Sequence, residues 1–369
     1  MKIAQIAPLI ESVPPRLYGG TERVVSYLTE ELVRQGHDVT LFASGDSETS
    51  ARLVACCERA LRLDPRVREH IPYHLAMLEK VRRLAARFDI LHFHTDLVHF
   101  PVFSSVRQAT VTTLHGRLDL FELQDFYRSF SNMPLVSISD AQRTPISDAN
   151  FAATVPHGLP RDLLAATYRR NGDYLAFIGR IAPEKGVDRA IEIARQVGMP
   201  LKIAAKVDRA DEAYFREVIA PLLSARFVQF IGEIDEREKV RFIGDAQTLL
   251  FPIDWPEPFG LVMIEAMACG TPVLAFDRGS VREVIDNGVS GIIVNSMTEA
   301  IAAVRAATSL DRSAVRRHFE QRFTAKRMAT QYVRLYEELN APTRSESIMP
   351  FKVPAHQAAQ PSAQAPATP

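Results

Sequence analysis

Two glutamates, Glu257 and Glu265, stand eight positions apart, and a carboxylate is a side chain that can bind hydroxyl groups. The spacing alone indicates little, so the interpretation depends on the helix between them. Pro258 suits the first turn of a helix, and Gly270 with Pro272 marks the end of that helix. Glu257 is therefore expected just ahead of the helix, and Glu265 about two turns into it. A carboxylate at Glu265 can accept two hydrogen bonds from a ribose diol. The alternative is a capped helix that carries one solvated glutamate.

The same helix offers two further features that favour a binding site. Its first backbone N–H groups have no partner within the helix, so they can bind an anion or a hydroxyl group. Glu265 stands among apolar side chains, and an acidic group in such surroundings requires a partner. The residues concerned are Phe259, Gly260 and Leu261 at the helix start, and Met263, Ile264, Met267 and Ala268 around the glutamate.

Two cations, Arg180 and Lys185, follow an expected strand and precede an expected helix. This position is the crevice at the carboxyl end of a parallel sheet, where α/β proteins bind ligands. A permanently charged guanidinium and a flexible ammonium suit a diphosphate there. Position alone leaves open a solvated loop with two ordinary basic residues.

Several common nucleotide and metal motifs are missing from the chain. The sequence has no G-x-G-x-x-G after a strand, no G-x-x-x-x-G-K-[ST], no H-E-x-x-H and no Asp-x-Asp pair. The last absence matters because many sugar-nucleotide enzymes hold a divalent cation with such a pair. The sequence therefore predicts no metal and no cofactor, so side chains and backbone groups would have to neutralise a diphosphate.

One cluster of histidines indicates a different chemistry. His92 and His94 are two positions apart, so their side chains lie on one face of an expected strand, and Asp96 and His99 follow closely. Such a pair occurs in some metal-dependent hydrolases. Further ligands are not identifiable in the sequence, so a metal-dependent hydrolase that uses His92 and His94 stays an alternative.

The bulk composition excludes several classes of protein. The 369 residues suggest about two domains, and 44 basic residues balance 44 acidic ones, so we expect no nucleic-acid partner. Three cysteines make no disulfide framework, and no apolar run approaches the roughly 20 residues that cross a bilayer. The amino terminus indicates a first strand and no signal peptide, so we expect a cytoplasmic protein.

Short apolar runs alternate with segments of helical period along most of the chain, which is typical of α/β proteins with parallel sheets. Thr21 is expected to cap a helix that ends near Gly36, and a break at 155–160 precedes a short polar helix. A further helix is expected over Val187–Val197. The expected strands are Lys2–Ala7, Asp38–Ala43, Asp89–Phe93, Thr110–Leu114, Leu135–Ile138, Tyr174–Ile178, Leu201–Ala205, Phe227–Ile231, Thr248–Pro252 and Pro272–Phe276.

These elements predict two Rossmann-like domains, at 1–165 and 171–322, followed by an amphipathic helix at 325–340. Residues 341–369 contain few large apolar residues, so we expect them to be disordered. A basic stretch at 59–87 lies on or near another amphipathic helix. Contact with an anionic membrane is one interpretation of this stretch, and a solvated basic face is favoured over it. Its cations are Lys80, Arg82, Arg83 and Arg87.

The motifs together resemble the retaining glycosyltransferases of family 4, whose GT-B architecture has two Rossmann-like domains facing each other across a cleft. The resemblance covers nearly the whole chain to about residue 340. Its most specific part is the Glu257-x7-Glu265 motif within EPFGLVMIEAMACGTPV, together with Gly179-Arg180 and Lys185-Gly186. Further matching segments are Gly19-Gly20-Thr21-Glu22, Thr113-Leu114-His115-Gly116 and Val136-Ser137-Ile138-Ser139. Histidine at position 157 replaces the asparagine of a Pro-Asn-Gly element, and residues 276–280 depart from the usual glycine pair.

The resemblance implies a role for each matching residue. Arg180 and Lys185 would bind the donor diphosphate and stabilise its leaving charge. Glu265 would hold the ribose hydroxyls, and Glu257 would contact the transferred sugar together with the N–H groups of residues 259–261. His115 would lie beside the reacting sugar.

The amino-terminal glycine loop and the last helix also have implied roles. Gly19 and Gly20 would contribute to donor binding, with Gly20 allowing the backbone to approach the phosphate without a Cβ clash. The helix at 325–340 would cross back to pack on the first domain. The donor would be held mainly by the second domain and the acceptor mainly by the first.

The resemblance further implies substrates and rival functions. The donor would be a nucleotide diphosphate sugar, with UDP-glucose as the expectation, and the acceptor a small molecule, a lipid or a glycan. Similarity to the bacterial UDP-glucose:tetrahydrobiopterin glucosyltransferases would favour a small aromatic acceptor. Two alternatives stay open, namely a sugar-nucleotide epimerase of the same fold and a sugar-nucleotide sensor without catalysis.

Overall fold

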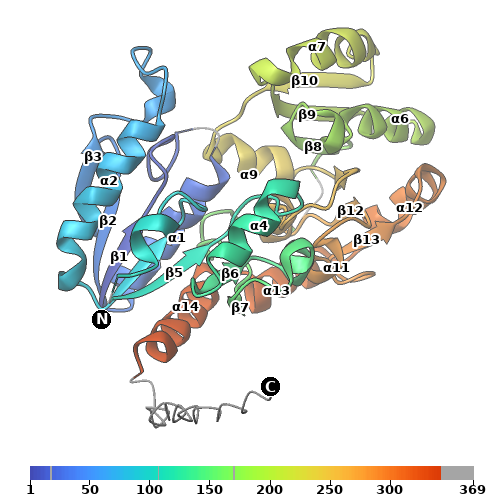
Figure 1. The fold of residues 1–369 in the computed structure, drawn as a ribbon. Helices are drawn as coiled ribbons and strands as arrows, with labels where there is room; N and C mark the ends of the chain where they lie inside the picture. The colour runs from blue at the N-terminus through green and yellow to red at the C-terminus, as the bar shows by residue number, and fades with distance from the viewer. Residues whose placement is uncertain (17–18, 107, 169–170, 342–369) are drawn as a thin grey trace, which may run out of the picture.

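The computed structural model describes residues 1–16, 19–106, 108–168 and 171–341. It contains two parallel sheets flanked by helices, which confirms the predicted α/β fold class (Figure 1). The segment predicted to be a disordered tail lies outside the described residues from position 342 onward.

Seven parallel strands form the amino-terminal sheet in the order β3-β2-β1-β4-β5-β6-β7. The strand order reverses between β1 and β4, and ligands bind at such switch points, beyond the carboxyl ends of the strands. The strands are β1 (Lys2–Ile6), β2 (Asp38–Ser44), β3 (Arg52–Cys57), β4 (Ile90–Phe93), β5 (Ala109–Thr113), β6 (Leu135–Ser137) and β7 (Phe151–Thr154). The helices of this domain are α1 (Gly20–Arg34), α2 (Ile71–Leu84), α3 (Phe100–Phe103), α4 (Phe121–Ser129) and α5 (Asp140–Arg143).

Six parallel strands form the carboxyl-terminal sheet in the order β10-β9-β8-β11-β12-β13, and its switch point lies between β8 and β11. The strands are β8 (Leu175–Arg180), β9 (Leu201–Lys206), β10 (Val228–Gly232), β11 (Thr248–Phe251), β12 (Val273–Phe276) and β13 (Gly291–Val294). The helices are α6 (Val187–Val197), α7 (Glu212–Tyr214), α8 (Ala220–Leu222), α9 (Glu236–Gly244), α10 (Leu261–Ala268), α11 (Val281–Val284), α12 (Met297–Ser309) and α13 (Arg312–Arg322).

The last described helix, α14 (Ala325–Asn340), follows the second sheet in sequence but packs against α1 and β5 of the first domain. The Thr324 hydroxyl caps its start by accepting from the backbone N–H of Arg327. Its apolar face carries Tyr332 and Tyr336, both fully buried. A segment that follows the second domain therefore completes the core of the first.

The expected strands lie within two residues of the observed ones, and the helix over Val187–Val197 is confirmed. Three strands, β3, β7 and β13, were missed by the sequence interpretation. All three lie at the edges of their sheets. An edge strand has one unpaired side and a mixed burial pattern, so it lacks the continuous apolar run that reveals a central strand of a parallel sheet.

Two helix starts differ from their sequence signals. Gly19 with φ 154° is the N-cap of α1, so Thr21 lies within the first turn and is not the cap. Gly260 with φ 77° is the N-cap of α10, so Pro258 precedes the helix and Glu265 lies just over one turn into it. In both places the chain enters the helix through a positive φ that glycine adopts without strain, which overrides the threonine and proline signals.

The short polar helix expected after residue 160 is not formed: residues 161–168 contain a turn and a bend and otherwise no regular element. Arg316 of α13 explains this difference. Its guanidinium donates to the carbonyl oxygens of Arg161, at 2.6 Å, and of Leu164, at 3.0 Å. Those carbonyl groups are therefore bound by a side chain from the second domain, and a helix would need them for its own hydrogen bonds.

Candidate functional site

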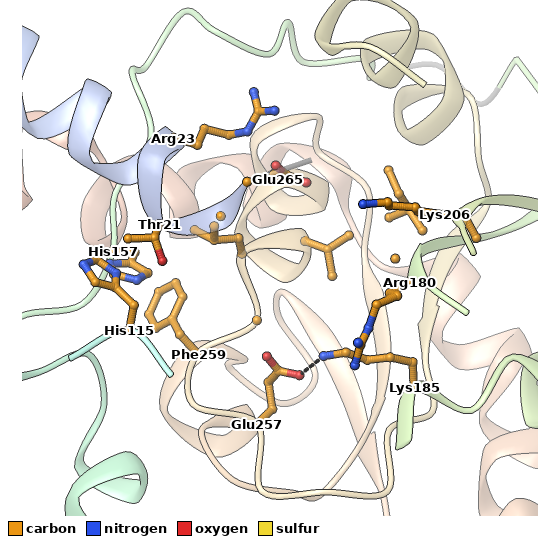
Figure 2. Close-up of a pocket in the computed structure, with 18 of the residues that line it drawn as sticks. Thr21, Arg23, His115, His157, Arg180, Lys185, Lys206, Glu257, Phe259 and Glu265 are labelled. Carbon is orange, nitrogen blue, oxygen red and sulfur yellow. Dashed lines mark hydrogen bonds and ion pairs between the residues drawn. The ribbon is translucent and has the colours of Figure 1, made fainter. Parts of the chain in front are cut away.

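A cavity of about 470 Å³ lies between the two domains and is lined by residues of both. Figure 2 shows Arg180, Lys185 and Lys206 along one side and His115, His157 and Phe259 along the opposite side. All ten residues proposed from the sequence line this cavity, namely Gly19, Gly20, His115, Arg180, Lys185, Glu257, Phe259, Gly260, Leu261 and Glu265. Segments more than 200 residues apart in the chain thus meet in one place.

The cations of the second domain stand at the carboxyl edge of its sheet. Arg180 is the last residue of β8, and its Nη2 atom lies 2.6 Å from Oε1 of Glu184. Its Nη1 atom lies 3.4 Å from Oδ2 of Asp211. Lys185 ends a short 3₁₀ helix, η4 (Pro183–Lys185), that follows the strand. Both side chains remain partly exposed to the cleft, so a diphosphate could approach them.

Glu257 is fixed beside these cations before any ligand binds. Its Oε2 atom accepts from Nζ of Lys185 at 2.6 Å and from the indole Nε1 of Trp255 at 2.8 Å. The Lys185 ammonium also lies 4.7 Å from the centre of the Trp255 ring, within cation–π range. Figure 2 draws the contact between Lys185 and Glu257 at one end of the cavity. One donor pair therefore holds the carboxylate in a single orientation.

The loop that carries Glu257 is also braced from the opposite domain. Ser139, whose side chain is buried, donates from Oγ to the carbonyl oxygen of Pro258 at 2.6 Å. Ser139 therefore contacts the loop that precedes α10 and joins the two domains in this structure.

Glu265 lies at another part of the cavity wall, on α10. Its carboxylate is almost fully buried, and its Oε1 atom accepts from Nζ of Lys239 at 2.8 Å. The sequence requirement for a partner at this buried glutamate is thus met by Lys239 of α9. Among the residues that the structure describes, this is the one hydrogen bond to the carboxylate, which leaves Oε2 for a ligand.

The glycine loop of the first domain starts α1 against the second domain. A Cβ on Gly19 would lie 2.7 Å from Cβ of Pro15, so no side chain fits there. A Cβ on Gly20 would lie 3.5 Å from Cδ1 of Leu261, which is ordinary van der Waals contact. Within the protein the strict steric requirement therefore falls on Gly19. The implied closeness of Gly20 to a phosphate stays a prediction.

Two histidines of the first domain, His115 and His157, line the cavity and belong to a buried network of histidines. Nε2 of His115 lies 2.9 Å from Nδ1 of His94, whose Nε2 lies 2.8 Å from Oε1 of Gln5. Burial lowers the pKa of His115 to about 3 and holds the pKa of His94 well below its usual value. The ring of His157 stacks at 5.2 Å on that of His115 and meets Phe259 of the other domain edge-on at 5.0 Å.

The histidine pair considered for a metal site belongs to the same network. Nδ1 of His92 lies 2.6 Å from the hydroxyl of Tyr336, and Nε2 lies 2.7 Å from Oγ1 of Thr113. Both ring nitrogens are therefore hydrogen-bonded to protein groups, as are both nitrogens of His94. Within the described ranges, no group of three or more His, Cys, Asp or Glu side chains is arranged to hold a metal ion. This geometry favours a structural network over the metal-dependent hydrolase.

Sequence reasoning missed four cations that line the cavity: Arg23, Arg62, Lys206 and Lys239. Lys206 ends β9 beside Arg180 at the end of β8, so the rule that found Arg180 would also have found it. Its Nζ atom lies 2.8 Å from Oδ1 of Asp208. Arg23 follows the glycine loop by one turn of α1. Lys239 lies in an ordinary polar helix, and no sequence signal separated it from a solvated lysine.

The basic helix considered for membrane contact is α2. The guanidinium groups of Arg82 and Arg83 both bind Glu79 of the same helix, and Lys80 donates to the carbonyl oxygen of Ala55. Much of the positive charge is therefore paired within the protein, and membrane contact stays a prediction. In the described part of the chain, none of the helices has the length and apolar character to span a membrane.

Two facing parallel-sheet domains with a cleft between them define the GT-B fold, and solved structures of that fold are similar to this chain. Sucrose-phosphate synthase from Thermosynechococcus elongatus has a TM-score of 0.76 at 19% identity, covering 92% of this chain and 98% of that one. The HepE protein of Anabaena, crystallised with UDP and glucose, has a TM-score of 0.70 at 19% identity, covering 92% and 100%. These similarities confirm the predicted GT-B fold.

The sequence comparisons identify the family. Residues 18–145 match Glycosyltransferase Family 4, and residues 167–322 match Glycosyl transferases group 1, so the two matches cover more than three quarters of the chain. The phosphatidyl-myo-inositol mannosyltransferase of Mycobacterium leprae is 27% identical over 91% of this chain and 96% of its own length. A glycogen synthase of Mycobacterium tuberculosis is 26% identical over 76% and 79%. The chain belongs to the GT-B glycosyltransferases that combine these two domains.

Proposed function

We propose that the chain transfers a hexose, with glucose as the first candidate, from a UDP-activated donor to an acceptor hydroxyl group. Transfer would retain the anomeric configuration and would need no divalent metal ion. One observation carries this proposal: a single cavity between the domains has Arg180 and Lys185 on one side and a buried, half-occupied carboxylate, Glu265, on another. A nucleotide diphosphate sugar has complementary groups, namely an anionic diphosphate and a ribose diol.

The two cations supply what a metal ion supplies in other sugar transferases. When the bond between the sugar and the diphosphate breaks, negative charge builds up on the departing phosphate oxygen. Arg180 and Lys185 are held by Glu184 and Glu257 before the reaction, so they need little reorganisation to stabilise that charge. Lys206, at the neighbouring strand end, adds a third positive charge to the same wall.

The proposed reaction uses the face of the sugar from which the diphosphate leaves. The acceptor oxygen forms a bond to the anomeric carbon, the bond from that carbon to the phosphate oxygen breaks, and the acceptor proton passes to the released diphosphate. Glu257 already accepts from two donors, Lys185 and Trp255, which supports a role in holding the sugar over a role as covalent nucleophile.

Comparison with relatives supports the choice of substrates. The similar HepE structure holds UDP and glucose, which favours a uridine donor. The mycobacterial relative is named for transfer to phosphatidyl-myo-inositol, which favours a lipid acceptor. The resemblance to pterin glucosyltransferases that the sequence suggested is not confirmed by these comparisons, and it would favour a small aromatic acceptor instead. We therefore propose a small molecule, lipid or glycan as the acceptor class.

Nucleotide release from a panel of donors tests the proposal. The purified chain is incubated with UDP-glucose, GDP-mannose or ADP-glucose, with and without a pool of acceptor extracts, and the released nucleotide is measured. We expect acceptor-dependent release of UDP and a product whose anomeric configuration, by NMR, equals that of the donor. Release of UDP with free sugar and no dependence on acceptor would favour the epimerase, and an inverted product would contradict retention.

A further inference from the structure

Four side chains of alternating charge form a row of ion pairs that crosses the cleft and ends at Glu265. Arg23 of α1 forms an ion pair with Glu236 of α9. Nζ of Lys239, one turn further along α9, lies 3.5 Å from Oε1 of Glu236 and 2.8 Å from Oε1 of Glu265. Arg23 belongs to the first domain and the other three residues to the second. Figure 2 shows Arg23 and Glu265 on the same side of the cavity.

The Lys239 ammonium interacts with two carboxylates, those of Glu236 and Glu265. Arg23 also binds Glu236, so it affects which of the two carboxylates Lys239 contacts more closely. The Lys239 and Glu265 side chains are only 11% and 7% exposed, so neither charge is well solvated and each needs its partner. Lys239 is 0.7 Å closer to Glu265 than to Glu236. Glu236 can release Lys239 in this way because Arg23 neutralises it. Without Arg23, Glu236 would compete for the same ammonium from the preceding turn of the same helix.

The position of Arg23 connects this row of ion pairs to the glycine loop. Gly19 caps α1 and Gly20 begins it, so the loop and Arg23 move as one body with the first domain. When the two domains approach each other, the glycine loop reaches the cavity and Arg23 reaches Glu236. Opening of the cleft would move the loop away from the cavity and Arg23 away from Glu236.

We propose that Arg23 and Lys239 are positioning residues that couple closure of the cleft to binding of the nucleotide. With Arg23 on Glu236, Lys239 holds Glu265 in the orientation that presents Oε2 to the ribose hydroxyls. By linkage, a nucleotide bound at Glu265 favours the closed arrangement by the same factor by which closure favours the nucleotide. This inference rests on the proposed function, because it takes Glu265 as the carboxylate that binds the nucleoside.

Charge reversal tests the coupling. The variants Arg23→Glu and Glu236→Arg and the double variant are titrated with UDP by calorimetry, and small-angle X-ray scattering of the ligand-free proteins reports closure. Each single reversal is expected to weaken UDP binding by at least about fivefold, the lower end of typical couplings between sites, and to increase the radius of gyration. The double variant is expected to regain UDP affinity within about twofold of the parent, since a pair of opposite charges again spans the cleft.

Two further variants separate positioning from folding. Lys239→Met should weaken UDP as the single reversals do, and Lys239→Arg should retain most of the affinity. Arg83→Glu, which breaks a surface pair with Glu79 on α2, is the matched control and should leave UDP affinity and the radius of gyration unchanged.

The outcomes distinguish this inference from the proposed function. A parent that binds UDP together with folded single reversals of unchanged affinity would overturn the coupling and leave the proposed function standing. A double variant that loses as much as the two singles together would also overturn it. If the parent binds none of UDP, ADP and GDP, the proposed function fails. The scattering comparison still decides the role of Arg23, because an unchanged radius of gyration in Arg23→Glu contradicts a contact that holds the cleft closed.

Discussion

Two regions of the cleft differ in their electrostatics: the charged wall of the second domain and the histidine region of the first domain. The wall of the second domain holds charged groups in pairs, such as Lys185 with Glu257 and Lys239 with Glu265. The first domain contributes a neutral region at His115 and His157, whose pKa values are lowered by burial, beside charged residues such as Arg23 and Glu22 near the start of α1. A ligand of strongly uneven charge would therefore be bound by the wall of the second domain and shaped by the histidine region.

The difference follows from where each set of residues stands. Arg180 and Lys185 occupy a strand end and a 3₁₀ turn, where their side chains reach solvent on one side. Lys239 and Glu265 are instead buried and neutralise each other. His92 and His115 of the histidine network lie on β4 and after β5, in the interior of a sheet covered by α14. Burial there disfavours the charged form of imidazole. Removal of a charge should consequently have a large effect on the wall of the second domain, whereas the histidine region should respond mainly to pH.

Removal of the two cations proposed to stabilise the leaving diphosphate should have the largest effect. Arg180→Ala and Lys185→Ala are each expected to lower turnover at saturating donor by about a hundredfold to a thousandfold, the typical cost of losing one preorganised electrostatic contact. Donor binding should weaken less, because the contact strengthens as the diphosphate departs. The double variant should fall short of the product of the two losses, since both cations act on one diphosphate. Steady-state kinetics measure these effects. A folded, saturable variant within about threefold of the parent would remove that residue from the role.

Removal of Glu265, the carboxylate proposed to bind the ribose, should have a smaller effect of a different kind. Glu265→Ala should weaken donor and free nucleotide together by at least about tenfold, because hydrogen bonds to a charged group contribute about 1.5–3 kcal/mol. Glu265→Gln keeps one acceptor oxygen and should lose less. Calorimetric titration of the released nucleotide provides the measurement. Unchanged affinity in a folded alanine variant would show that the carboxylate does not contact the nucleoside.

Acidification should act mainly on the histidine region. Burial lowers the pKa of His157 and its neighbours in the folded state, so protons bind the unfolded chain first as pH falls below about 6.5. The free energy of unfolding should therefore decrease with acidification from neutral pH, by up to about 1.4 kcal/mol per pH unit for each such histidine. Denaturant titrations between pH 7 and pH 5 should show that the free energy of unfolding of His157→Asn falls less steeply than that of the parent, by the contribution of one histidine.

The matched control is His70→Asn, which removes a half-exposed imidazole outside the histidine region and shows what the loss of any histidine does to the measurement. A His157→Asn variant with the slope of the parent would mean that the ring takes up a proton in the folded protein, and would contradict a neutral histidine region.

Chelation should have the smallest effect. Turnover in the presence of EDTA is expected to equal that of the untreated enzyme, because Arg180, Lys185 and the start of α10 take the place of a cation. Assays with excess EDTA, followed by addition of single divalent metals, give the measurement. Activity that is lost on chelation and restored by one metal would contradict the proposed metal independence.

The sequence predicted the wall of the second domain better than the histidine region of the first, and the residues explain why. Arg180, Lys185 and Glu257 are close to strand ends or a helix start, so their local sequence already indicates a ligand-facing position. His115 was placed by resemblance alone, and its hydrogen-bond partner His94 is 21 residues away in the sequence. Lys239 carried no local signal, since its partner Glu265 is 26 residues away.

The sequence by itself determined the alternation of strands and helices, the central strands of both sheets and the ligand-facing positions of Arg180, Lys185 and Glu257. Those features follow from apolar periodicity and from the chemistry of single residues, which are local properties. Only the tertiary structure decided which helix starts glycine would control, that α14 completes the first domain, and that Arg23, Glu236, Lys239 and Glu265 form one row of ion pairs. These are contacts between distant segments, and their geometry depends on how the two domains pack rather than on any single stretch of sequence.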